Sequence, residues 1–222
     1  MVQFTIIFKN YKKHLTGFKK TIMKKTSIFI ALFFLLFTAK AQEVHFGVKG
    51  GLNISQLHFN DNTISDSKAG IHLGILAHIH ASKTWAIQPE LLFSMEGAKN
   101  VGDPRVTYNL NYLNVPVLLQ YMFDNGIRLE GGPQIGFLLG AKTKSGGVTV
   151  DNKGFESTAV SIPLGIGYIT SSGLGFDARY VFGLSNINGS KNDPSIQSNV
   201  FQLGLFYQFS DIKLPAHHYP HH

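Results

Sequence analysis

The stretch Leu174-Gly175-Phe176-Asp177-Ala178-Arg179-Tyr180-Val181-Phe182-Gly183-Leu184 decides the fold class of this chain. Its even-numbered positions are mainly apolar, and its odd-numbered positions are polar, small or charged. Alternation with a period of two is typical of a β-strand that has one apolar face and one polar face. A soluble sandwich would turn the apolar face inward, whereas a barrel in a bilayer would turn it outward and keep the charges in its lumen.

Charged residues follow the same rule in the other apolar stretches. Seven of them lie within such stretches, all on the polar side of the alternation: Lys49, Glu90, Glu96, Arg128, Glu130, Asp177 and Arg179. The opposite side carries bulky apolar residues and no charge. Because an Arg or Lys that faces lipid costs about 2–4 kcal/mol at the bilayer midplane, an uncharged outer face favours a membrane barrel.

Runs with this alternation, bounded by turn residues, predict eight strands. They lie near residues 44–57, 68–81, 84–97, 108–122, 126–141, 157–170, 173–186 and 198–209. Three connections are tight, at Ser82-Lys83, Asp124-Asn125-Gly126 and Ser171-Ser172-Gly173. The other four are expected to have about ten residues or more, near 58–67, 98–107, 142–156 and 187–197.

Short and long connections therefore alternate along the whole chain. An up-and-down barrel produces this order, because every second hairpin emerges on the same side of the membrane, with short turns toward the periplasm. A sandwich with crossover connections does not require it. The sequence predicts an all-β protein, an eight-stranded antiparallel up-and-down transmembrane β-barrel in the cell outer membrane.

The N-terminal region predicts export. Met23-Lys24-Lys25, the apolar run 28–37 and Ala39-Lys40-Ala41 have the order of a signal peptide that is cleaved before Gln42. The apolar run is too short for a spanning helix, which needs about 20 residues. We therefore expect an upstream extension at 1–22, a signal peptide at 23–41, a barrel domain at 42–210 and a His-rich disordered tail at 211–222.

The net charge of +7 belongs to this leader. Residues 1–41 contain eight lysines and no acidic residue, which leaves 12 basic and 13 acidic side chains in the remainder. The expected mature protein is thus nearly neutral, which argues against nucleic acid as a partner. Cysteine is absent, so disulfides and thiol chemistry are excluded.

Aromatic residues and prolines mark special positions in the predicted strands. Six aromatics fall near the short-turn ends and predict one interfacial girdle: Phe46, Trp85, Tyr121, Tyr168, Tyr207 and Phe209. Four prolines lie inside predicted strands, namely Pro89, Pro116, Pro133 and Pro163. Because each removes a ladder hydrogen bond in a barrel that has no free edge, we expect β-bulges there.

Several phrases resemble the PorT-like outer-membrane β-barrel family. They are Phe46-Gly47-Val48-Lys49-Gly50-Gly51-Leu52-Asn53-Ile54-Ser55, Gln88-Pro89-Glu90-Leu91-Leu92-Phe93-Ser94, Tyr112-Leu113-Asn114-Val115-Pro116-Val117-Leu118-Leu119-Gln120-Tyr121, Gly131-Gly132-Pro133-Gln134-Ile135-Gly136, Ala178-Arg179-Tyr180 and Leu203-Gly204-Leu205-Phe206-Tyr207-Gln208-Phe209. The resemblance implies a barrel of about eight strands in a Bacteroidota-type envelope. It implies no common reaction and no catalytic residue, and family chains usually end at the aromatic matched by Phe209.

The seven charges form the main candidate site. An eight-stranded barrel has an interior just wide enough for side chains, so three basic and four acidic groups are expected to pair into a network that fills the lumen. Three histidines, His45, His78 and His80, are weak candidates for a metal site, with His45 expected opposite His80. Polar filling of a wet rim explains them as well, and we assign no metal and no cofactor.

Three functions remain open on the sequence. The first is a non-enzymatic barrel that acts as a structural or interaction component of the envelope through its surface loops. The second is a narrow channel or a conduit for small hydrophobic ligands, and the third is a rim enzyme that uses His58, Asp61 and Asp66 with Ser65 and Ser67. Expected partners are outer-membrane lipid, the barrel-insertion machinery and other envelope proteins.

Overall fold

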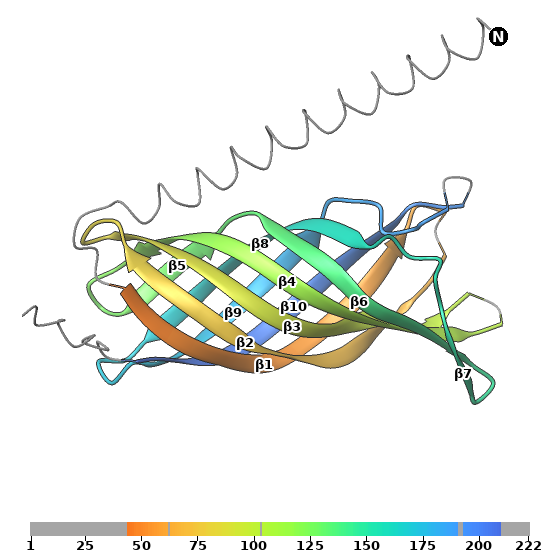
Figure 1. Ribbon diagram of the computed structural model, residues 1–222, viewed down its shortest axis with the longest axis horizontal. Coiled ribbons are helices and arrows are strands. Elements are labelled where there is room, and N and C mark those ends of the chain that lie inside the picture. Colours follow the sequence, from red (N-terminus) through yellow and green to blue (C-terminus); the bar gives the residue numbers. More distant parts are fainter. Residues whose placement is uncertain (1–43, 62, 103, 191–192, 210–222) are drawn as a thin grey trace, which may run out of the picture. The chain divides into compact units, whose positions relative to one another are not determined.

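The computed structural model describes residues 44–61, 63–102, 104–190 and 193–209, which form an antiparallel β-barrel (Figure 1). The predicted extension, signal peptide and His-rich tail lie outside the described residues. In the described ranges, no helix is long and apolar enough to cross a membrane. The strands are β1 Val44–Phe59, β2 Asp66–His80, β3 Trp85–Val101, β4 Val106–Met122, β5 Ile127–Gly131, β6 Gln134–Ser145, β7 Val148–Asp151, β8 Thr158–Ile169, β9 Leu174–Gly183 and β10 Ile196–Gln208.

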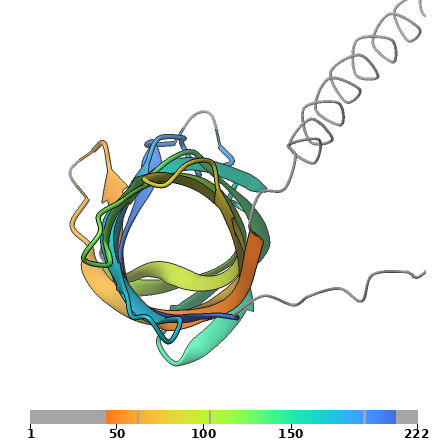
Figure 2. The same ribbon diagram turned by 90° about the vertical axis from the view of Figure 1, so that its left-hand side faces the viewer.

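Hydrogen-bonded neighbours close the sheet into a ring (Figure 2). Pairing runs from β3 through β2, β1, β10, β9 and β8 to β5, β6 and β4, and β4 pairs again with β3. Strands β5 and β6 together occupy one position of the ring, because both pair with β4 on one side and with β8 on the other. The ring thus has eight positions, which confirms the predicted eight-stranded antiparallel barrel.

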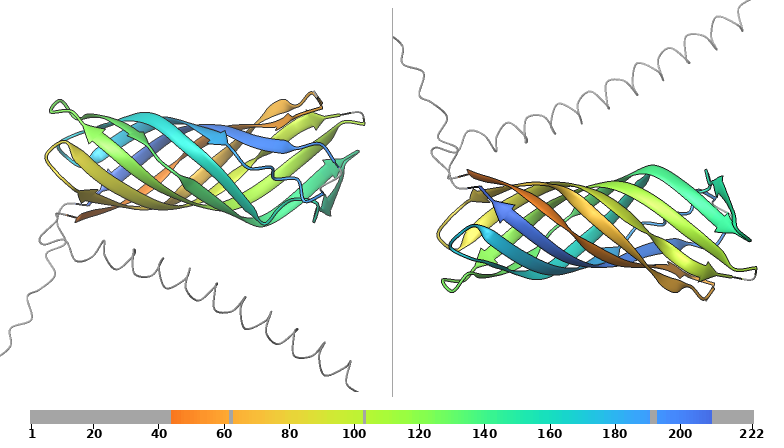
Figure 3. Two further views of the ribbon diagram at one scale, coloured as in Figure 1. Left: turned by 90° about the horizontal axis from the view of Figure 1, so that it is seen from above. Right: turned by 90° about the horizontal axis from the view of Figure 1, so that it is seen from below.

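The three short turns lie together at one end of the barrel and the longer connections at the other (Figures 1 and 3). Two short turns depend on glycine. Gly126 has φ 87° and Gly173 has φ 86°, a left-handed conformation that glycine adopts without steric cost. The third turn is held by Ser82, whose hydroxyl oxygen accepts the Trp85 N–H at 3.0 Å.

Two predicted connections are wrong in extent. The region 98–107 is mostly strand, because β3 runs to Val101 and β4 begins at Val106. The region 142–156 is not a plain loop, since β6 continues to Ser145 and pairs with the added strand β7 in a projecting hairpin. In both regions the strands continue to pair through their backbones past the long-loop end of the barrel, so the loops are shorter than predicted. Ala98 and Val101 also pack into a buried apolar cluster, which favours an extended β3.

The predicted bulges at the four prolines are mostly wrong. Pro89, Pro116 and Pro163 keep their register with Val117, Gln134 and Val181. Each proline therefore removes a single ladder donor without adding a residue. Pro133 lies where the predicted strand 126–141 breaks into β5 and β6. The register irregularities described lie elsewhere, between Ser67 and His72, Ala98 and Val101, and Asn111 and Tyr112.

The two faces of the barrel wall differ as the alternation predicts. Outward side chains at mid-strand are exposed, for example Leu52 at 61%, Leu73 at 65% and Leu205 at 63%. Inward positions are buried and largely polar, and they include Asn53, Gln120 and Gln202. The polar interior lies where a soluble barrel would have its apolar core.

Candidate functional site

All seven charged residues singled out in the sequence lie inside the barrel, with exposed fractions between 1% and 6%. Each comes from an inward position of its strand, so the alternation of the strand turns it into the lumen. Ionic groups at this depth require partners, because an unpaired buried charge is strongly destabilising. The seven charged residues differ in the kind of partner that each one contacts.

Arg179 on β9 is the centre of the ion pairs. Its Nη1 and Nη2 atoms donate to the two carboxylate oxygens of Glu90 on β3, both at 2.7 Å. Its Nε atom donates to Glu130 on β5. Glu130 also accepts a hydrogen bond from Gln120 Nε2 at 2.7 Å. The planar guanidinium thus bridges two carboxylates with the bidentate geometry that arginine favours.

A second pair extends this cluster. Lys49 Nζ on β1 lies 2.7 and 2.6 Å from the two carboxylate oxygens of Asp177 on β9. Asp177 Oδ1 is also 3.6 Å from Arg179 Nε. We call Lys49, Glu90, Glu130, Asp177 and Arg179 the luminal ion cluster.

Glu96 does not belong to the luminal ion cluster. Its carboxylate accepts hydrogen bonds from Ser94 Oγ at 2.9 Å, Asn114 Nδ2 at 3.0 Å and Ser198 Oγ at 3.3 Å. Lys68 donates to the backbone carbonyl of Glu96 at 3.0 Å. Neutral donors therefore surround this carboxylate, which lies nearer the long-loop end of the barrel.

Arg128 also stands apart from the luminal ion cluster. Its guanidinium carbon lies 4.1 Å from the centroid of the Phe206 ring, in a cation–π arrangement. Among the described residues, its Nε atom has no hydrogen-bond partner. Phe206 was missed by sequence reasoning, although its signal was visible as a large apolar residue on the inward side of β10.

The long-loop end of the lumen contains an apolar cluster that the sequence reasoning did not predict. It consists of the buried side chains Leu57, Phe59, Ala98, Val101, Leu110, Tyr112, Ala141, Ile187 and Ile196. Ile187 comes from the connection 184–195 and is only 1% exposed. Its backbone N–H donates to Ile196 at 2.9 Å, and its carbonyl accepts from Glu156 at 2.8 Å. We call this set the apolar seal.

The three candidate histidines gather at the short-turn end. His45 pairs with His78 rather than with His80, so the predicted partner is wrong by two residues because the first hairpin turns one residue earlier than expected. The ring centroids of His45 and His80 are 5.6 Å apart, and those of His78 and His80 are 4.6 Å apart. Among the described residues, no group of three or more His, Cys, Asp or Glu side chains is arranged to hold a metal ion.

The six predicted girdle aromatics lie at the short-turn end on the outer wall. Trp85 and Tyr121 are in edge contact with centroids 5.0 Å apart, and Tyr207 and Phe209 are 5.6 Å apart. Phe46 is 55% exposed on the same surface. Tyr168 contacts Phe176 at 5.5 Å, which adds an aromatic that the sequence reasoning did not include.

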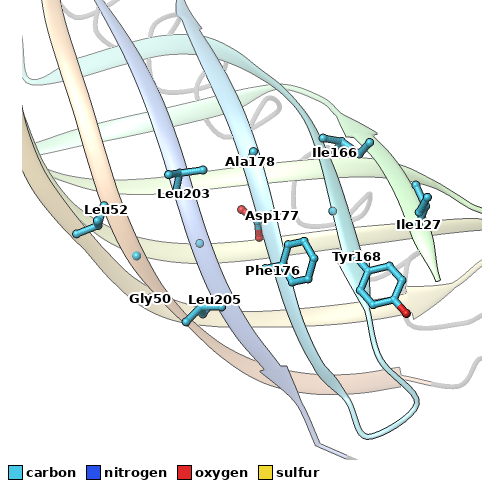
Figure 4. Close-up of a pocket in the computed structure, with 13 residues that line it drawn as sticks. Gly50, Leu52, Ile127, Ile166, Tyr168, Phe176, Asp177, Ala178, Leu203 and Leu205 are labelled. Carbon is cyan, nitrogen blue, oxygen red and sulfur yellow. The ribbon is translucent and has the colours of Figure 1, made fainter.

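An open groove of about 630 Å³ crosses the outer wall over β1, β10, β9, β8 and β5 (Figure 4). Its sides are apolar and include Leu52, Leu203, Ile166 and Phe176, while Gly50 and Ala178 leave space between them. Because this surface is the apolar face of the barrel, the groove fits hydrocarbon chains and offers little hydrogen bonding.

Three of the candidate side chains in and beside the first long loop form local hydrogen bonds. Ser65 Oγ donates to the Leu57 carbonyl at 2.6 Å, and Asp61 accepts the backbone N–H of Thr63 at 3.0 Å. Asp66 accepts from Asn100 at 2.7 Å. In the described ranges, these groups are engaged locally, and no hydrogen bond connects a serine to a histidine in this loop.

The fold and the site agree with a known domain family. The family model described as outer membrane protein beta-barrel domain matches residues 40–189. The chain belongs to this family. It is therefore an outer-membrane β-barrel protein, which agrees with its uncharged outer face and its polar lumen. No curated protein sequence matches the chain.

One solved structure supports the fold of this outer-membrane barrel, and a second is reported for comparison only. Neisserial surface protein A is 14% identical, with a TM-score of 0.54, and the match covers 74% of this chain and 97% of that protein. Ail, the attachment invasion locus protein of Yersinia pestis, is 16% identical, with a TM-score of 0.49 over 75% of this chain and 99% of Ail. At these identities, the similarity concerns the fold alone.

Proposed function

We propose that this outer-membrane protein is a closed, non-enzymatic barrel that acts in the envelope through its surface loops. The observation that carries the proposal is the combination of the luminal ion cluster and the apolar seal. The first joins β1, β3, β5 and β9 through side chains across the lumen. The second fills the mouth from which the longer connections emerge.

Conductance in planar bilayers tests the closed lumen. The protein is expected to give no stable, reproducible steps, because buried side chains occupy the cross-section at two levels. Arg179→Ala removes part of the blockage, because it shortens the side chain that spans the lumen. The matched control, Arg105→Ala, alters only the exposed loop end. Stable steps from the unmodified protein would overturn the proposal and favour the narrow channel.

The outer-wall groove favours the hydrophobic-ligand alternative over an aqueous channel. Its lining is almost entirely apolar, and it opens toward the lipid rather than along the barrel axis. Binding of a long-chain fatty acid to the folded protein, lost in Ala178→Phe and retained in Ala69→Phe on the exposed outer face of β2, would support this second function. Equal binding by both variants and the parent would contradict it.

The proposed function also includes the export of the protein and its orientation in the outer membrane. We propose that residues 23–41 are removed before Gln42, that the short turns face the periplasm and that the aromatic girdle marks that membrane interface. The PorT-like resemblance supports a Bacteroidota-type envelope and delivery by the barrel-insertion machinery. N-terminal sequencing of the protein from outer membranes tests the cleavage, and a sequence that begins before residue 42 would contradict it.

A further inference from the structure

The short-turn mouth of the barrel contains a cavity of about 560 Å³. Its lining includes Arg128, Lys83 and the three clustered histidines, and Asp124 is the acidic residue among the described lining residues. The mouth is therefore rich in nitrogen donors. It lies at the opposite end of the lumen from the apolar seal.

Arg128 is buried at this cavity. The side chain is 2% exposed, and it forms no ion pair with the described carboxylates. The acidic residues of the luminal ion cluster already have partners. Glu130 accepts hydrogen bonds from Gln120 and Arg179. Asp177 is paired with Lys49. The positive charge of Arg128 is thus left at the edge of the luminal ion cluster, beside the cavity.

Two glycines make room for this arrangement. A Cβ atom at Gly167 would lie 3.0 Å from Arg128 Nε, and a Cβ atom at Gly175 would collide with the Phe206 ring. Phe206 in turn lies against the guanidinium. Close packing therefore fixes the guanidinium on an aromatic ring rather than on an anion, so that its orientation is set before any ligand binds.

A second buried donor lies at the same cavity. Gln208 is 7% exposed, and its Nε2 atom has no hydrogen-bond partner among the described residues. Two donors that lack a partner in the described part of the chain, one from β5 and one from β10, thus lie at one cavity. Buried donors of this kind are normally paired, because leaving them without a partner costs free energy.

We propose that the short-turn mouth binds a small oxyanion, a carboxylate or phosphate group, between the Arg128 guanidinium and the Gln208 side-chain amide. The planar fork of a guanidinium matches both groups in a bidentate manner. Lys83 adds positive charge at the rim of the cavity. The ligand is either a free anion or the headgroup phosphate of a lipid, and the proposal does not depend on whether the lumen conducts.

Nitrogen-15 NMR of the full chain, folded in phosphate-free maltoside micelles, tests the site. Titration with inorganic phosphate is expected to shift the Arg128 side-chain Nε–Hε signal and the Ile127 and Gln208 backbone amides in a saturable way. Arg128→Gln is expected to abolish the shifts at both amides. Gln208→Leu, which keeps the guanidinium, is expected to weaken binding about tenfold, because one hydrogen bond to a charged group is lost.

The control is Arg105→Gln, which removes the same charge from an exposed position at the long-loop end and is expected to bind like the parent. Addition of phosphatidylglycerol to the micelles distinguishes the two sources. Shifts of the same signals by this lipid but not by phosphate assign the site to a headgroup. Shifts that do not saturate with either probe, or that persist in Arg128→Gln, would overturn the proposal.

Discussion

Arg179 and Glu90 meet across the full width of the barrel. Four steps separate β9 from β3 in either direction around the eight-position ring, yet the guanidinium and the carboxylate are joined by two hydrogen bonds of 2.7 Å. The pair therefore ties opposite walls together. It also occupies the middle of the lumen, where an open channel would need water.

Removal of Arg179 alone is expected to destabilise the barrel strongly. Arg179→Met leaves Glu90 and Glu130 buried without their cation, and a broken buried pair typically costs about 3–5 kcal/mol. Urea unfolding in micelles, followed by the fluorescence of the single tryptophan, Trp85, measures the loss.

The matched variant removes all three charges of the bridge that Arg179 forms with Glu90 and Glu130. Arg179→Met with Glu90→Leu and Glu130→Leu is expected to be more stable than Arg179→Met alone, because no charge of the bridge is left unpaired. A triple variant less stable than the single one would show that the bridge is not the cause. Glu156→Gln, on the exposed surface, is the control for loss of a carboxylate.

The apolar seal is expected to depend on Ile187. Ile187→Ala removes a fully buried side chain and should loosen the connection 184–195, at a cost of about 2–5 kcal/mol if the cavity does not collapse. Hydrogen exchange should accelerate at two backbone amides. The Ile187 amide donates to the Ile196 carbonyl, and the Glu156 amide donates to the Ile187 carbonyl. Unchanged exchange there would argue against a packed seal, and the Leu203 amide in the barrel wall serves as the internal control.

The lipid-facing register is tested by an arginine on the outer wall. Leu73 lies near the middle of β2 and is 65% exposed, so Leu73→Arg is expected to cost about 2–4 kcal/mol of stability in a bilayer. Ile64→Arg is the matched control, because Ile64 is 80% exposed in the first long connection. Heat-modifiable migration in gels after folding into vesicles compares the two, and equal folding yields would contradict the register.

Close packing of the lumen is tested at a glycine. A Cβ atom at Gly51 would collide with the Leu203 carbonyl and would lie 2.8 Å from both Gly204 Cα and His72 Cε1. Gly51→Ala is therefore expected to destabilise the barrel by about 1–3 kcal/mol. Gly140→Ala is the control, because nothing lies within 4 Å of its Cβ position. A stable Gly51→Ala protein in the same urea assay would contradict the packing.

The strand pattern could be predicted because its cause is local. The apolar side of Leu174–Leu184 and its counterparts indicated which side chains face lipid, and tight turns such as Asp124-Asn125-Gly126 indicated where hairpins close. The bounds were less certain. β3 extends to Val101 because inward packing beyond the wall continues the pairing, and no local turn signal marks that end.

The partners of the luminal charges could not be predicted in the same way. The alternation along each strand placed Glu96 and Arg128 on the inner face with the other five charged residues. This alternation carries no information on the distances between side chains across the barrel. Glu96 is surrounded by Ser94, Asn114 and Ser198, and Arg128 lies on Phe206. The histidine register was missed for a related reason, because a hairpin that turns one residue earlier moves every cross-strand partner by two.

By itself the sequence determined the class of the protein, since alternation, turn spacing and the absence of charge on one face are properties of neighbouring residues and of their contact with lipid. Only the tertiary structure decided that Arg179 bridges Glu90 and Glu130, that Ile187 enters the long-loop mouth and that Arg128 faces a cavity at the other end. These contacts join residues far apart in the chain. They depend on ring closure, shear and register, which together set the distances between opposite walls.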